Sequence, residues 1–143
     1  MKKHLIALAA AAAVSLPLAA AAQMERTPAP EGANVYFITP ADGERVMSPV
    51  TVRFGTSGIG VAPAGVDHQN TGHHHLLIDT GTPNPNSPIP SDDNHLHFGG
   101  GQTQTTVDLA PGEHTLQLLM GDAKHVPHDP PITSQKITIT VVE

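Results

Sequence analysis

Histidines recur at every second position in two short segments of this chain. The first segment contains His73 and His75, and the second contains His95 and His97. In a β-strand, residues i and i+2 point to the same face and lie about 6.5–7 Å apart along the strand. Each pair therefore predicts two imidazoles on one face of a strand. Such a pair can bind one transition-metal ion, because imidazole nitrogen is a ligand of both Zn(II) and Cu(II).

The residues that alternate with these histidines predict an apolar face on the other side of each strand. Leu76 and Ile78 alternate with the first pair, and Leu96 and Phe98 with the second. We expect the apolar face to pack in the core, and the histidines to lie on the opposite, wetter face, within reach of a metal ion. If the two strands are neighbours, all four imidazoles gather on one face of a sheet. The alternative is that they are surface histidines, or histidines hydrogen-bonded to the backbone.

The remaining histidines are weaker candidates as ligands. His125 and His128 lie at H-x-x-H spacing in a loop, and we expect them to complete or flank the site, since loops that follow strands meet at one end of a sandwich. His68 precedes the first pair and can approach from its own loop. His74 and His114 share faces with leucines, which favours buried histidines satisfied by hydrogen bonds.

The choice of metal follows from the side chains that the chain offers. There is no cysteine and there are only four methionines, so thiolate sites are excluded and a copper(I) thioether site lacks ligands. Asp92, Asp93 and Asn94 offer oxygen ligands for calcium, although they are too few for an all-oxygen cage. Cu(II) or Zn(II) is the predicted cofactor. We expect its affinity to fall as the pH drops through about 6.5, and the metal-free protein to be sensitive to acid.

Residues 1–22 predict a cleaved signal peptide. Lys2 and Lys3 precede an apolar run that ends in the small residues Ala20 to Ala22, as in an A-x-A cleavage site. The run is too short for a membrane-spanning helix, so we expect a periplasmic or secreted protein without membrane insertion. Without this segment, five cationic residues face 13 acidic ones, a formal charge of −8. This balance argues against nucleic acid as a partner and suits a cation.

The rest of the chain predicts an all-β fold. Residues 23–33 are polar and contain prolines, and we expect a flexible leader. Residues 34–143 predict one domain, an immunoglobulin-like antiparallel β-sandwich of about seven strands, because short runs of period two alternate with turn residues. A loop with no periodicity separates the two histidine segments, and loops of this length are often functional or mobile. The expected strands are residues 34–39, 46–56, 73–80, 95–98, 103–109, 114–121 and 132–142.

Four motifs make the chain resemble a family of small exported bacterial proteins known as domain of unknown function 4399. The motifs cover nearly the whole chain after the signal peptide. The resemblance implies export, in agreement with the signal peptide, but it implies no mechanism. The motifs are G-H-H-H-L-L-I-D (72–79), H-L-H-F-G-G-G-Q-T (95–103), L-A-P-G-E-H-T-L-Q-L (109–118) and G-D-A-K-H-V-P-H-D-P (121–130).

These observations favour an exported protein that takes up, buffers or delivers Cu(II) or Zn(II). Its partners would be the metal ion and, as an open alternative, another exported protein. A metal-independent immunoglobulin-like interaction module is the competing hypothesis. A metal-dependent hydrolase or redox enzyme is the third, since three histidines with Asp79 or Asp93 would imitate a hydrolytic zinc site. The chain has neither a G-x-S-x-G motif nor a cysteine nucleophile, and we assign no catalytic residue.

Overall fold

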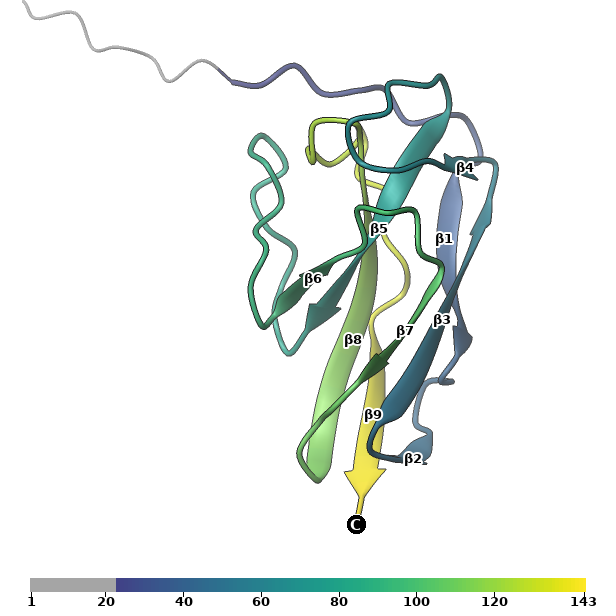
Figure 1. Ribbon diagram of the computed structural model, residues 1–143, viewed down its shortest axis with the longest axis vertical. Coiled ribbons are helices and arrows are strands. Elements are labelled where there is room, and N and C mark those ends of the chain that lie inside the picture. The colour runs from purple at the N-terminus through teal and green to yellow at the C-terminus, as the bar shows by residue number, and fades with distance from the viewer. Residues whose placement is uncertain (1–22) are drawn as a thin grey trace, which may run out of the picture.

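The part of the chain that the structure describes folds into two β-sheets and the loops that join their strands. The computed structural model describes residues 23–143, and the predicted signal peptide lies outside the described residues. Within them there are nine strands and no helix (Figure 1). No stretch of residues 23–143 forms a helix long and apolar enough to cross a membrane. The strands are β1 (Asn34–Thr39), β2 (Arg45–Met47), β3 (Val50–Ser57), β4 (Gly60–Val61), β5 (Thr71–Ile78), β6 (His95–His97), β7 (Gln104–Val107), β8 (Gly112–Gly121) and β9 (Ile137–Val142).

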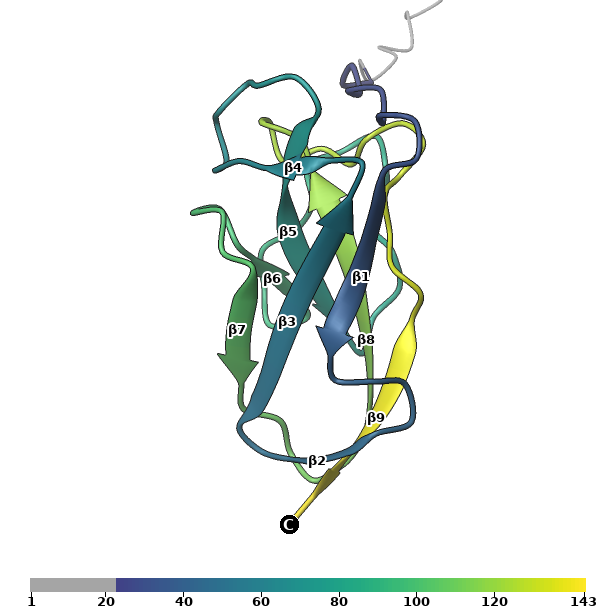
Figure 2. The ribbon, with the colours of Figure 1, turned by 90° about the vertical axis from the view of Figure 1, so that its right-hand side faces the viewer.

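The two sheets face each other as the layers of a sandwich. The smaller sheet has the strand order β1-β3-β7, and the larger has the order β2-β9-β8-β5-β4, with β6 paired to β5 as well. Figure 2 shows the smaller sheet in front of the larger one. The prediction of an all-β sandwich is confirmed, with nine strands where about seven were expected.

The core lies between the sheets and follows from the period of two in the sequence. Val50, Val52 and Phe54 of β3 are buried, and the residues that alternate with them are mostly exposed. The apolar residues of β8 and β9 share this core as well: Leu116, Leu118, Met120, Ile137, Ile139 and Val141. Leu76 and Ile78 of β5, together with Phe98, contribute from the histidine-bearing segments.

The expected strand 46–56 is divided in two. β2 pairs with β9 in the larger sheet, whereas β3 pairs with β1 and β7 in the smaller one. The chain crosses between the sheets at Ser48 and Pro49, where proline cannot donate a ladder hydrogen bond. Val46 has the same parity as Val50 and Val52, with only Ser48 between them, so the alternation did not reveal the break.

Candidate metal centre

Four imidazoles gather beside the larger sheet. They belong to His73, His75, His97 and His125, and one nitrogen atom of each lies within 4.8 Å of the others. A tetrahedral ion with metal–nitrogen bonds of about 2.0–2.1 Å has nitrogen–nitrogen separations of about 3.4 Å. His73 Nε2 and His125 Nδ1 are already 3.4 Å apart. The cluster is therefore compatible with binding one metal ion after small side-chain movements.

The strand pairing places three of these side chains. β5 and β6 are antiparallel neighbours, and His75 lies directly opposite His97 in their register. The rings of this pair are stacked with centroids 5.0 Å apart, and the rings of His73 and His75 are 4.8 Å apart. The two histidine segments are therefore neighbouring strands, which is the condition for their imidazoles to gather on one face.

The fourth side chain comes from the loop that follows β8. His125 has a φ of 64°, a conformation that is uncommon for residues other than glycine. Its backbone N–H donates to the carbonyl of Asp122 at 3.0 Å, and its carbonyl accepts from Ile89 N–H at 2.7 Å. Its ring lies 4.2 Å from that of His97, centroid to centroid. The G-D-A-K-H motif carries a signal for this turn, because an aspartate often binds backbone N–H groups a few residues further on.

The other two predicted ligands lie apart from the cluster. His95 lies opposite Leu77, further along β6, and its Nδ1 contacts a carboxylate oxygen of Asp92 at 2.8 Å. His128 is buried, and its Nε2 donates to the carbonyl of Thr71 at 3.3 Å. Four of the six predicted ligands therefore come together, and His95 and His128 do not belong to the group.

The three histidines not proposed as ligands occupy different environments. His114 contacts Asp79 through Nδ1 at 2.7 Å and donates to a backbone carbonyl through Nε2 at 2.8 Å. The ring is thus satisfied by hydrogen bonds, as expected. His74 is buried against Phe54, with ring centroids 4.9 Å apart, but neither of its ring nitrogens has a hydrogen-bond partner among the described residues. His68 is exposed.

The expectation of a wet histidine face is wrong for β5, whereas the histidines of β6 are partly exposed. His73 and His75 are 1% and 0% exposed, because two loops fold over this side of the sheet. Ile89 from the loop between β5 and β6 packs in a small apolar cluster with Leu77 and Leu119. Both loops contain prolines and lack periodicity, so the sequence did not show that they would cover the face.

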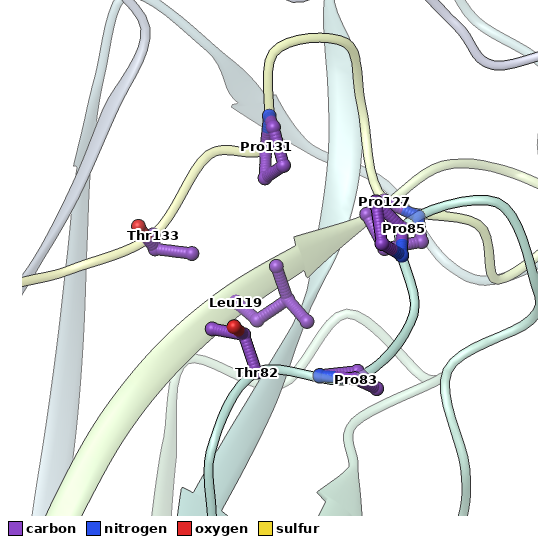
Figure 3. A pocket seen from close by; sticks show the side chains of 7 residues that line it. All are labelled: Thr82, Pro83, Pro85, Leu119, Pro127, Pro131 and Thr133. Atoms are coloured by element: carbon purple, nitrogen blue, oxygen red, sulfur yellow. The ribbon is translucent and has the colours of Figure 1, made fainter.

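A small cavity lies between the two covering loops. Its volume is about 310 Å³, and Leu119 of β8 lies among its lining residues (Figure 3). Leu119 is the cross-strand neighbour of His75, so the cavity adjoins the histidine cluster on its apolar side. The remaining lining residues are Thr82, Pro83, Pro85, Pro127, Pro131 and Thr133.

The cluster contains nitrogen atoms without a partner. Neither ring nitrogen of His75 has a hydrogen-bond partner among the described residues, and the same holds for Nε2 of His97. Burying an unpaired polar atom costs free energy, and such atoms are rare in folded proteins. A bound ion would supply the missing partner, so the orphaned nitrogens fit a metal site.

Burial favours the neutral form of the three strand histidines of the cluster. Burial, reinforced by neighbouring histidines, lowers the pKa of His73 to about 4 and that of His75 to about 2. The pKa of His97 is lowered for the same reasons. Neutral imidazole is the form that binds metal. Protons compete for the rings of His73 and His75 only well below the expected pH of about 6.5, which corrects that expectation for these two histidines.

Because Gly99 has no side chain, the imidazole ring of His97 can lie against its backbone. A Cβ at this position would lie 2.5 Å from Cε1 and 2.8 Å from Nε2 of His97. We expect Gly99→Ala to displace the ring and to weaken metal binding about tenfold or more, as loss of a supporting contact does. Gly100→Ala is the matched control, because its Cβ would meet only the side chain of Gln102 at 3.1 Å. Equal affinities of the two variants in a metal titration would refute the assigned position of His97.

Comparison with known proteins identifies a family. Residues 52–142 match the family described as Domain of unknown function (DUF4399). The chain belongs to this family. The match spans β5, β6, β8 and the loop of His125, so all four clustered histidines lie inside the DUF4399 region. No curated protein and no solved structure matches the chain.

Proposed function

We propose that this protein is an exported metal carrier that takes up, buffers or delivers Cu(II) or Zn(II). The observation that carries the proposal is the group of four converging histidines. His73 and His75 are fully buried, and His75 and His97 carry ring nitrogens without a hydrogen-bond partner among the described residues. Export rests on the predicted signal peptide. The acidic balance of the chain suits a cationic cargo.

The ligand set favours carriage over catalysis. Catalytic zinc sites keep one coordination position open for water or substrate, whereas four protein ligands close a tetrahedral ion. A hydrolytic site also requires a general base. The nearby carboxylate of Asp122 accepts hydrogen bonds from Thr27, Lys124 and Val126, so it is engaged in holding the loop.

The donor atoms restrict the cargo to a short list of ions. Neutral imidazole suits Cu(II) and Zn(II), and the general order of affinities places Cu(II) above Zn(II). All four ligands are neutral, so the ion keeps its full positive charge. The negative charge of Asp122 favours a cation at the histidine cluster, as it acts to raise the pKa of His73.

A calorimetric titration of the untagged mature chain, residues 23–143, tests the proposal. At neutral pH we expect Cu(II) or Zn(II) to saturate at one equivalent with a dissociation constant below about 1 μM, as four converging imidazoles should provide. Calcium, which prefers oxygen ligands, is the control and should give no saturable heat. Weak heat without a defined stoichiometry for all three ions would refute the carrier and favour the interaction module.

A further inference from the structure

The segment Arg26–Ala29 lies along the loop that follows His125. Asp129 N–H donates to the carbonyl of Thr27 at 2.9 Å, and Ala29 N–H donates to the carbonyl of Asp129 at 2.8 Å. The Arg26 guanidinium donates to the carbonyls of Pro127, at 3.2 Å, and His128, and lies 3.3 Å from the carboxylate of Asp129. The leader is thus joined to this loop by backbone and side-chain contacts, which the sequence did not predict.

Thr27 also reaches the carboxylate that shapes the ligand loop. Its hydroxyl donates to Asp122 Oδ2 at 2.8 Å. The other oxygen, Oδ1, accepts the backbone N–H groups of Lys124 at 2.9 Å and Val126 at 3.0 Å. These two residues flank His125. Asp122 is 3% exposed, so its three hydrogen bonds lie largely away from water, where each of them matters more.

His125 depends on this support more than the other ligands do. His73, His75 and His97 lie on paired strands, whereas His125 lies in a loop with a positive φ. A residue other than glycine keeps that conformation only where its surroundings hold it. The Asp122 turn and the hydrogen bond from Ile89 N–H keep His125 in this conformation.

We propose that Thr27 and Arg26 are positioning residues for the fourth metal ligand. The N-terminal segment acts as a latch on the 122–129 loop, and the latch sets the metal affinity through His125. The inference rests on the proposed metal-binding function. Coupling between two sites is reciprocal, so bound metal also strengthens the docking of the segment.

The test is a double-mutant cycle with Zn(II) as the probe, in the untagged mature chain. We expect Thr27→Val to bind Zn(II) about tenfold more weakly than the unsubstituted chain, as loss of an outer hydrogen bond to a ligand does, with one equivalent still bound. In a His125→Ala background the same substitution should change the affinity by less than about twofold, because the residue through which it acts is absent.

Three further measurements guard against a general effect on folding. Thr27→Ser keeps the hydroxyl and should keep the affinity. Thr51→Val removes a hydroxyl from an exposed position of β3 in the opposite sheet and should leave the affinity unchanged. Hydrogen exchange of the Ala29 and Asp129 amides should slow more than exchange of the β3 amides when Zn(II) is added, because a general gain in stability would slow both groups alike.

Each outcome decides the matter. An unchanged affinity of Thr27→Val, or an equal loss with and without His125, overturns the latch while the metal site stands. Amide hydrogen exchange at Ala29 and Asp129 that does not slow more than exchange of the β3 amides on addition of Zn(II) also refutes the latch. Zn(II) binding by the unsubstituted chain is measured first. Its absence would refute the proposed function and, with it, the latch.

Discussion

We expect the replacement of both His75 and His97 by alanine to abolish the proposed metal binding. The two side chains lie opposite each other in the β5–β6 register and supply half of the clustered ligands. Loss of a supporting residue around a metal costs about 10–100-fold in affinity, and loss of two ligands should cost more than about 100-fold. A calorimetric titration with Cu(II) and Zn(II) measures the change.

Strand β6 itself provides the matched control for this double variant. His95 belongs to the same H-x-H motif as His97 but contacts Asp92 and lies outside the cluster. We expect His95→Ala to retain the affinity of the unsubstituted chain. A circular-dichroism melt of each variant at neutral pH shows whether the fold is kept. A loss of affinity in His95→Ala as large as in the double variant would contradict the assigned ligand set.

The metal-free protein should lose stability as the pH falls from 7 to 5. The folded-state pKa is about 4 for His73 and His74 and about 2 for His75, with burial as the main cause. The unfolded chain protonates these rings near 6.5, whereas the folded chain keeps them neutral. Stability is therefore full above about pH 6.5 and falls as the pH drops toward the folded-state values. At pH 5 each buried ring contributes a loss on the order of 2 kcal/mol.

Chemical denaturation at pH 7 and pH 5 in the presence of a chelator measures this loss. His114 acts in the opposite sense, because its contact with Asp79 raises its pKa, so its stabilisation is present at pH 5 and is lost as the pH rises. The contribution of His114 therefore offsets part of the loss of stability at pH 5. The variant His74→Leu removes one buried titrating ring and should show a smaller loss between the two pH values. Equal unfolding free energies at pH 7 and pH 5 would contradict the neutral state of the buried histidines.

The sequence predicted the fold and most of the histidine cluster because strand alternation is a local property. Val50, Val52 and Phe54 indicated an inward face, and His73 with His75 indicated the opposite one. Alternation also indicated that His95 and His97 share a face. It could not determine which of them meets His75, because a shift of the register by two residues keeps every side chain on its own face.

The contribution of His125 and the burial of the site depend on contacts between distant segments. His125 enters the cluster through a turn built on Asp122, and Ile89 covers it from a loop without periodicity. The crossing at Pro49 was missed for a similar reason, since the apolar residues keep the same parity on both sides of it while the pairing partner changes. Local pattern does not specify which loops fold back over a sheet.

The origin of the ligands in three separate parts of the chain has a consequence for folding. His75, His97 and His125 are each more than twenty residues apart in sequence, so an ion bound by all of them closes two long loops of the polypeptide. Cross-links across long loops reduce the entropy of the unfolded chain the most. In a chain that has no cysteine, the ion then performs the task that disulfides perform in many exported proteins. A carrier of the proposed kind would become easier to unfold, and more open to proteases, on releasing its ion.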